Sequence, residues 1–178
     1  MYIGQPVTYR PTMWHTALQE RTYDLLDRLG VGFLRVDTED VITMEDCRQV
    51  DAALQVRVVK TLFLCNRQQT QFYLCVMPGD KPFVTRDFGR VLGVSRVSFA
   101  PAEMLKSMLQ TEPGGTSLFS LLADEERRVR FIIDRPVLQT PFYGCTDTTY
   151  YSYMRLQTDD VTRHIIPALN HTAEIVQL

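Results

Sequence analysis

The spacing of apolar residues predicts several helices along the chain. Leucines recur near one face of the stretch Thr16–Leu29, and Gly30 follows it, where a left-handed helix cap is favoured. A second helix is expected over Met44–Leu54, because Thr43 followed by Asp46 resembles a capping box at its start. Shorter helices are expected over Phe88–Leu92, from Pro101 to about Leu109, and over Asp159–Ile166.

Extended segments lie between these helices. The strongest signal is Val56–Cys65, which is rich in β-branched and aromatic residues. The polar stretch Asn66–Thr70 separates it from Gln71–Met77, so the two segments are expected to form a hairpin. Further strands are expected over Phe33–Asp37, Arg96–Phe99, Val129–Asp134, Tyr150–Leu156 and Glu174–Leu178.

The order of these elements predicts a single α/β domain over residues 1–178, with residues 1–12 as an irregular lead-in. No internal repeat, low-complexity tract or linker divides the sequence. Strands and helices are mixed without the regular βαβ alternation of a doubly wound sheet. The expected architecture is therefore a mixed, curved, barrel-like β-sheet with flanking helices.

Composition and charge narrow the classes of function. Hydrophobic residues make up 45% of the 178 residues and charged residues 22%, which is typical of a globular domain with its own core. The net charge of −2 argues against a protein that clamps DNA or RNA through a basic surface, but it allows brief contact with one tRNA end. A cytoplasmic protein without membrane contact is expected, because neither a signal peptide nor a long apolar run occurs. The oligomeric state stays open.

Neither the cysteines nor the histidines form a metal-binding pattern. Cys47, Cys65, Cys75 and Cys145 include no C-x-x-C pair, and the three histidines complete no zinc motif. Cys65 and Cys75 lie in apolar stretches, where reduced, buried thiols are expected. No metal and no cofactor are therefore expected.

One lysine interrupts the most apolar segment of the chain. Lys60 lies within Val58–Leu64, where a strand would turn a polar side chain to its outer, solvated face. The same position suits a fixed cation that reaches into a cleft and binds a phosphate or a developing oxyanion. The spacing alone favours the solvated lysine.

Paired glycines mark a loop at Pro113–Ser117. Gly114 and Gly115 have no Cβ, so their main-chain N–H groups can approach a ligand closely. No Lys-Ser/Thr pair follows, which excludes a Walker phosphate loop. Composition alone favours an ordinary turn between a helix and a strand.

The stretch Tyr143–Tyr151 is dense in hydroxyl groups and aromatic rings. Such residues either line a polar pocket or form a loop that leads into an edge strand. Cys145 would need a base to form a thiolate, and the sequence positions no particular histidine to serve it. Cys145 is therefore expected to be structural or to line a pocket, with catalysis a minor alternative.

Taken together, these segments resemble the YbaK/prolyl-tRNA-synthetase-associated editing domain family, in particular its free-standing ProXp-ala and PrdX-like deacylases. The run Lys60-Thr61-Leu62-Phe63-Leu64 is similar to the family's K-N-L-F-L strand, and Pro113–Phe119 stands where the family carries its P-G-S-V-[ST]-P-F loop. Further similar segments are residues 32–47, 72–82 and 93–100. The resemblance runs from about residue 16 to the C-terminus, almost the whole chain.

The resemblance implies hydrolysis in trans of the ester of a mischarged aminoacyl-tRNA, typically prolyl-tRNA bearing alanine or another small amino acid. Lys60 would bind the terminal nucleotide's phosphate or offset charge on the carbonyl oxygen. Gly114, Gly115, Thr116 and Ser117 would supply main-chain N–H groups and set the size of the pocket. The implied partner is the 3′ end of a tRNA, bound transiently, and this chemistry requires no metal.

The chain departs from the family's pattern at several positions. Thr61 replaces an asparagine and offers fewer hydrogen-bonding groups, and Leu118 replaces the loop's proline. In the G-[VC]-H-P-x-x-N-T motif, Gly144 and Cys145 match the family. Thr146, Asp147, Tyr150 and Tyr151 replace the His, Pro, Asn and Thr of that motif.

Two interpretations of these departures follow. The favoured one is a divergent member whose pocket is reshaped for another aminoacyl group, with Thr146, Asp147 and Tyr150 as new lining residues. The alternative is a catalytically inactive member that binds a small amino-acid-like ligand, an RNA end or a protein partner. A slip of one residue in the strand would turn Thr146 and Asp147 to the other face, so their orientation decides how the pocket is lined.

Overall fold

The computed structural model describes residues 2–39 and 44–178 and contains two β-sheets with helices around them. The larger sheet has five strands in the order β4-β2-β3-β5-β8, and the smaller has three in the order β1-β7-β6. The strands are β1 (Leu34–Asp37), β2 (Lys60–Asn66), β3 (Phe72–Met77), β4 (Val97–Phe99), β5 (Val129–Asp134), β6 (Phe142–Thr146), β7 (Ser152–Gln157) and β8 (Ala173–Val176).

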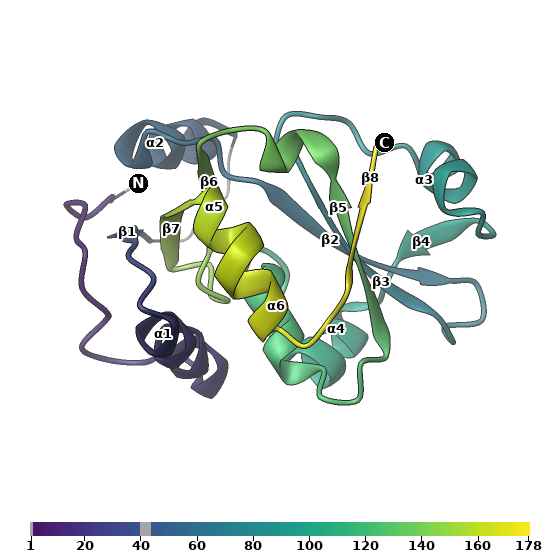
Figure 1. The fold of residues 1–178 in the computed structure, drawn as a ribbon, viewed down its shortest axis with the longest axis horizontal. Helices are drawn as coiled ribbons and strands as arrows, with labels where there is room; N and C mark the ends of the chain where they lie inside the picture. The colour runs from purple at the N-terminus through teal and green to yellow at the C-terminus, as the bar shows by residue number, and fades with distance from the viewer. Residues whose placement is uncertain (1, 40–43) are drawn as a thin grey trace.

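Helices cover both ends of this arrangement. The three-stranded sheet, α1 and α2 form one half of the molecule, and the five-stranded sheet with α3 forms the other (Figure 1). The α-helices are α1 (Ala17–Leu29), α2 (Met44–Leu54), α3 (Thr85–Leu92), α4 (Ala102–Leu109), α5 (Thr158–Asp160) and α6 (Ile166–Ala168). A π-helical stretch, Val161–Ile165, joins α5 to α6, and 3₁₀ turns lie at Leu118–Ala123 and Arg135–Leu138. None of the helices in the described ranges is long and apolar enough to span a membrane.

Local chemistry explains the best-defined helix. Thr16 caps α1 because its hydroxyl accepts a hydrogen bond from the Gln19 N–H at 3.0 Å. Gly30 ends the helix with a φ of 65°, a left-handed conformation that glycine adopts without strain. The expected boundaries of α1 and α2 are confirmed, whereas the proposed cap at Thr43 lies outside the described residues.

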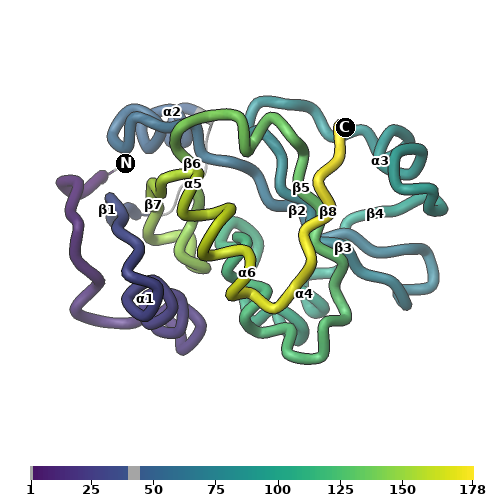
Figure 2. The backbone as a smooth tube through the Cα atoms, in the orientation of Figure 1, coloured from purple at the N-terminus to yellow at the C-terminus, as the bar shows by residue number. Residues whose placement is uncertain are grey.

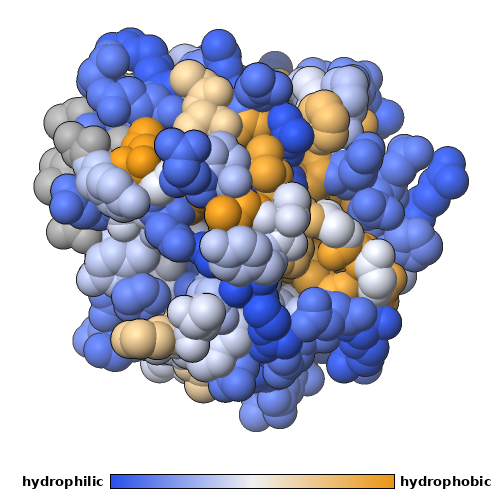
Figure 3. Space-filling view, turned by 90° about the vertical axis from the view of Figure 1, so that its left-hand side faces the viewer, coloured by the Kyte–Doolittle hydropathy of each residue, from blue (hydrophilic) through white to orange (hydrophobic). Residues whose placement is uncertain are grey.

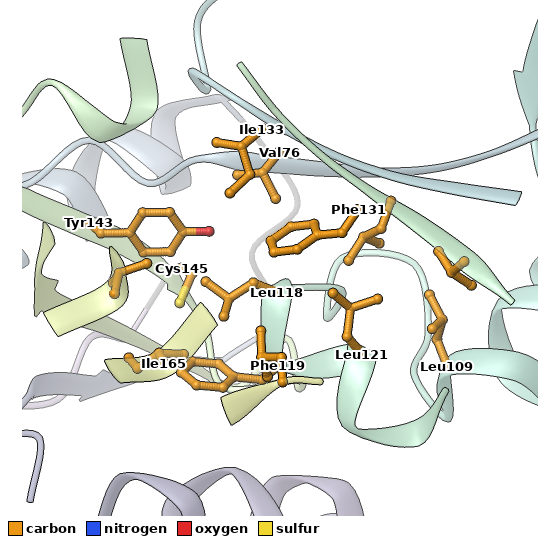
Figure 4. Close-up of a cluster of buried hydrophobic side chains, with 14 of the residues drawn as sticks. Val76, Leu109, Leu118, Phe119, Leu121, Phe131, Ile133, Tyr143, Cys145 and Ile165 are labelled. Carbon is orange, nitrogen blue, oxygen red and sulfur yellow. The ribbon is translucent and has the colours of Figure 1, made fainter. Parts of the chain in front are cut away.

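The predicted hairpin is confirmed and forms the centre of the larger sheet. β2 and β3 are antiparallel, with Lys60 opposite Met77, whereas β3 and β5 are parallel. Alternate residues of these strands therefore face two different cores. Phe63 belongs to the main apolar cluster shown in Figure 4, and Leu64 belongs to a second cluster against α3.

The two sheets meet along a short backbone contact between β6 and the residues that lead into β2. Val58 bridges Gly144 in parallel, and the Val59 N–H donates to the Gly144 carbonyl at 2.9 Å. This bridge is isolated, so the sheets do not close into a barrel. The mixed α/β class is confirmed, but the expectation of a barrel-like sheet is wrong, because the strands separate on either side of this contact.

The chain runs from one half of the molecule to the other. It starts beside the three-stranded sheet and ends in strand β8 of the five-stranded sheet (Figure 2). The expected irregular lead-in is tied to β1 by isolated bridges at Ile3–Thr38 and Val7–Arg35. The face that carries this segment is mostly hydrophilic, with apolar side chains showing near its centre (Figure 3).

Candidate functional site

Lys60 lies at the first position of β2, next to the junction of the two sheets. The side chain is half-buried and projects to the same face as Leu62 and Leu64. Its ammonium group donates a hydrogen bond to the carbonyl oxygen of Lys81. Lys81 in turn forms an ion pair with the fully buried Asp134, with 2.7 Å between Nζ and Oδ2. The structure thus brings Lys60 to a second lysine that the sequence analysis did not select.

Gly144 sits where β6 passes closest to the chain entering β2. A Cβ at this position would come within 2.8 Å of Val56 Cγ1 and 3.2 Å of the Val58 Cα. Only glycine fits this approach without a shift of the neighbouring chain. Since Val58 and Gly144 are paired in parallel, Lys60 and Thr146 each follow the bridge by two residues and project to the same face.

Thr146 connects β6 to the glycine loop. Its buried hydroxyl donates to the Gly115 carbonyl at 2.7 Å. A Cβ on Gly115 would lie 3.0 Å from the Thr148 carbonyl oxygen, so the loop and the β6–β7 connection are packed backbone against backbone. Gly114 has a φ of 90°, which favours glycine. The structure therefore brings together the two sequence segments that were selected as separate candidates.

The rest of the loop enters a 3₁₀ turn rather than an open ligand-binding arc. Ser117 is fully buried, and its N–H donates to the Ser120 hydroxyl at 3.1 Å. Thr116 is half-buried, with its hydroxyl 3.5 Å from the Glu112 carbonyl. Gly114 is exposed and Gly115 is buried, so the exposed edge of the loop ends at Gly114.

Asp147 is fully buried and has a complete set of protein partners. One carboxylate oxygen accepts from Gln19 Nε2 at 2.8 Å and from the Tyr23 hydroxyl at 2.9 Å. The other accepts from the N–H and the hydroxyl of Thr149. Burial raises the pKa of Asp147, although these hydrogen bonds act in the opposite direction. Asp147 thus ties α1 to the β6–β7 connection.

Cys145 points into the main apolar cluster next to Leu118, as Figure 4 shows. Only 1% of its surface is exposed, and burial raises the pKa of its thiol. A catalytic cysteine needs a lowered pKa and access for the substrate. The geometry therefore favours the structural role for Cys145 over the nucleophilic one.

Thr61 projects to the other face of β2 from Lys60. It pairs with Val76, whose side chain belongs to the main cluster, and it remains half-buried. Thr61 and Lys60 therefore approach the junction between the sheets from opposite faces.

A cavity of about 520 Å³ opens beside the glycine loop and the β6–β7 connection. Its lining residues are His15, Thr16, Lys106, Gln110, Thr111, Glu112, Thr148, Thr149, Tyr150 and Tyr151. Tyr150 was selected from the sequence, and its Cβ lies 3.7 Å from the Cβ position of Gly114. Thr148, Thr149 and Tyr151 belong to the stretch Tyr143–Tyr151, which was considered as a possible pocket lining. The remaining lining residues could not be predicted, because α1, α4 and the β6–β7 connection meet here only after folding.

Residues 2–39 and 44–178 contain no group of three or more His, Cys, Asp or Glu side chains that could hold a metal ion. They offer a lysine cation at the junction between the sheets, a glycine loop and a cavity with hydroxyl and aromatic walls.

A family model described as the aminoacyl-tRNA editing domain matches residues 38–164. The prolyl-tRNA editing protein ProX of Acetoanaerobium sticklandii is 24% identical over 153 residues, 86% of this chain and 93% of that protein. Prolyl-tRNA synthetase associated domain-containing protein 1 of Danio rerio is 27% identical over 118 residues, 66% of this chain and 64% of that protein.

Solved structures share the fold. A candidate trans-editing enzyme for prolyl tRNA synthetase superposes with a TM-score of 0.64 at 13% identity, covering 93% of this chain and 99% of that one. The hypothetical protein APE2540 superposes with a TM-score of 0.65 at 18% identity, covering 88% and 98%. The matched family region contains Lys60, the glycine loop and the β6–β7 connection.

Proposed function

The chain belongs to the aminoacyl-tRNA editing domain family, and from this premise we propose that it hydrolyses the ester bond of a mischarged aminoacyl-tRNA in trans. The relative from Acetoanaerobium sticklandii is named a prolyl-tRNA editing protein. The proposed substrate is accordingly prolyl-tRNA that carries a small non-cognate amino acid such as alanine, or a related species.

The observation that carries this proposal is the continuous connection from Lys60 to the glycine loop. Lys60 lies next to the contact between Val59 and Gly144, and Thr146, two residues further along β6, is bonded to Gly115. Three segments that are far apart in the sequence thus meet at one junction. They provide a cation and the exposed main chain at Gly114, whereas the N–H groups of Gly115 and Ser117 bond to Glu112 and Ser120. A cation and a main-chain N–H group are the kinds of group that stabilise an ester's tetrahedral intermediate.

In the proposed reaction, water attacks the carbonyl carbon of the ester and the bond to the ribose oxygen breaks. The ribose hydroxyl regains a proton, and the free amino acid is released. Lys60 exchanges its hydrogen bond with the Lys81 carbonyl for one to the terminal phosphate or to the developing oxyanion. The loop at Gly114–Gly115 limits the space for the amino acid, so a larger cognate side chain is excluded by its size.

A binding role without catalysis is the second candidate. It is favoured by the fact that Thr146 and Asp147, at the positions of the family's His-Pro pair, are buried and bonded within the protein. Neither side chain therefore replaces the lost histidine at the site. In this alternative the chain retains the fold and recognises an amino-acid-like ligand, an RNA end or a protein partner.

A deacylation assay separates the two candidates. Purified protein is mixed with tRNAs charged with alanine, serine, threonine, cysteine or proline, and release of the amino acid is followed over time. Hydrolysis of one mischarged species is expected, and Lys60→Ala is expected to lower its kcat/KM about 100-fold, within the range seen when one electrostatic group is removed. Arg67→Ala, which removes an exposed cation from the β2–β3 turn, is the matched control.

The results of this assay answer two separate questions: whether the protein is a deacylase, and whether Lys60 takes part in the reaction. Absence of hydrolysis above the buffer rate for every charged tRNA would contradict the deacylase proposal and favour the binding protein. Full activity of Lys60→Ala would keep the deacylase proposal but remove Lys60 from its mechanism. A chelator such as EDTA is expected to leave the rate unchanged, because the proposed chemistry uses no metal.

A further inference from the structure

The cavity beside the glycine loop has features that the ester hydrolysis does not use. It is formed by the start of α1, the end of α4 with the residues that follow it, and the β6–β7 connection. Its volume of about 520 Å³ is in the range of pockets that hold ligands of nucleotide size. It also adjoins the loop at Gly115, where Thr148 O lies 3.0 Å from the Cβ position.

Three aromatic rings lie in contact along one wall of this cavity, one pair stacked and the other tilted by 42°. The His15 ring stacks on Tyr151, with 4.5 Å between centroids and 25° between planes. Tyr151 lies 4.3 Å from Tyr150, and the two hydroxyl groups are 3.0 Å apart. His15 is exposed at the end of the series. Aromatic faces of this kind bind unpaired nucleic-acid bases by stacking, whatever the base.

Positive charge lies beside the aromatic series. Lys106 extends from α4 into the cavity wall and is exposed, with only a loose contact of 3.9 Å to Glu112. Thr16, the N-cap of the 13-residue helix α1, lines the same cavity, so the positive end of the helix dipole faces it. Together these groups suit a single phosphate more than an extended, highly charged backbone.

The third feature is an unsatisfied and strained residue. Thr148 lines the cavity, is 3% exposed, and its hydroxyl has no hydrogen-bond partner among the described residues. Its φ is 79°, which is unfavourable for a β-branched side chain, and the Thr111 hydroxyl holds it there through the Thr148 carbonyl. A strained residue with a spare hydroxyl is typical of a site that binds a ligand.

We propose that this cavity binds the unpaired nucleotides that precede the terminal adenosine at the 3′ end of the tRNA. One base stacks on His15, its phosphate is bound by Lys106, and the Thr148 hydroxyl is a hydrogen-bonding group for the nucleotide. This subsite rests on the proposed deacylase function. It adds to that function an explanation of how a chain with a net charge of −2 can bind one RNA end. Local stacking replaces the broad basic surface that the chain lacks.

The test compares two esters of the same amino acid, the one that the deacylation assay with charged tRNAs identifies as the substrate. One is the aminoacyl ester of the trinucleotide CCA, and the other is the aminoacyl ester of adenosine alone, which lacks the preceding nucleotides. In His15→Ala, kcat/KM for the trinucleotide ester is expected to fall about tenfold relative to the adenosine ester, which is the loss of one stacked base. Lys106→Ala is expected to act in the same direction. His164→Ala removes an exposed histidine that does not line the cavity and is the control.

Each outcome of this comparison decides the proposal. If His15→Ala lowers kcat/KM selectively for the trinucleotide ester, the subsite is supported. If it lowers kcat/KM equally for both esters, or for neither, the proposal is overturned. If the wild-type protein hydrolyses no ester, the deacylase proposal fails, and binding of fluorescently labelled, uncharged CCA is measured instead by anisotropy. Binding that weakens in His15→Ala but not in His164→Ala supports the subsite, and absence of binding overturns it.

Discussion

Strand β3 and the connection between β6 and β7 bury very different kinds of side chain. In the five-stranded sheet, all six residues of β3 are buried, from Phe72 to Met77, and they pack against apolar neighbours on both faces. The connection between β6 and β7 is buried just as deeply but consists of polar residues. The buried polar residues of this region are Thr146, Asp147, Thr148, Thr149 and Ser152.

This difference sets apart two ways in which the fold fixes its backbone. Apolar contacts have no strict direction, so the larger sheet tolerates small shifts and stabilises the fold through its buried area. Buried polar groups must each find a partner at a defined distance, so they fix the backbone more narrowly. The polar connection is therefore held in one conformation, with strain at Thr148, next to the cavity and the glycine loop.

The largest expected effect on stability lies in the larger sheet. Phe131 is 1% exposed in the main cluster, and Phe131→Ala is expected to lower the free energy of unfolding by about 3–5 kcal/mol through the cavity it leaves. Urea denaturation measures this loss. Val91→Ala, at an exposed position of α3, should change it by less than about 0.5 kcal/mol. A similar cost at both positions would show that the cluster is not the stabilising core.

A substitution in the polar connection between β6 and β7 is expected to lower the free energy of unfolding by less. Asp147→Asn replaces one acceptor oxygen by an amide that faces donors, and it should cost about 1–3 kcal/mol. Glu39→Gln, at an exposed acid of the same half of the molecule, is the matched control. If Asp147→Asn cost as little as this control, the four hydrogen bonds would not hold the connection.

Because of the buried Asp147, we also expect the free energy of unfolding to depend on pH with a defined sign. Because burial raises its pKa above the ordinary 3.8, the folded protein binds this proton more tightly than the unfolded chain. Asp147 should therefore make the free energy of unfolding decrease as pH rises from about 3.8 through its raised pKa. The decrease should be smaller in Asp147→Asn, where only groups such as Asp51, whose pKa burial also raises, still contribute. Urea titrations at several pH values measure the difference between the two proteins, and an increase with pH would contradict it.

Strain in the connection can be tested by glycine substitution at two neighbouring threonines. Thr148 has a φ of 79°, whereas Thr149 is not among the residues with positive φ, and its hydroxyl bonds to Asp147. Thr148→Gly is expected to cost less stability than Thr149→Gly, by about 1–2 kcal/mol, because glycine relieves the strain only at the first position. Equal costs in denaturant unfolding would show that the connection is unstrained.

The smallest effect concerns thiol chemistry. Cys47 is exposed, whereas Cys65, Cys75 and Cys145 are buried, and burial raises the pKa of Cys75 to about 12. The native protein should react with DTNB at Cys47, and the other thiols should react only after unfolding. Alkylation of the native protein should leave any ester hydrolysis intact. Inactivation that maps to Cys145 would instead restore the nucleophilic alternative.

Local sequence signals predicted the elements whose stability is local. The helix from Thr16 to Leu29 has its cap, its apolar face and its final glycine within the same stretch, and the β2–β3 hairpin lies within adjacent residues. By contrast, the stretch Tyr143–Tyr151 was described as a pocket lining or as a loop that leads into an edge strand, yet its first residues belong to strand β6 (Phe142–Thr146). Its partner residues in β7 and beside β2 are not encoded in its own composition.

The sequence by itself determined the helices, the central hairpin, the resemblance to the editing family and the choice of Lys60 and the glycine pair as candidates. Only the tertiary structure decided that the sheets stay separate, that Cys145 and Asp147 turn into the interior, and that His15 meets Tyr151. The physical reason is the range of the interactions. Caps, turns and apolar periodicity act between near neighbours, whereas the cavity depends on contacts between residues more than 100 positions apart, such as Gln19 and Asp147.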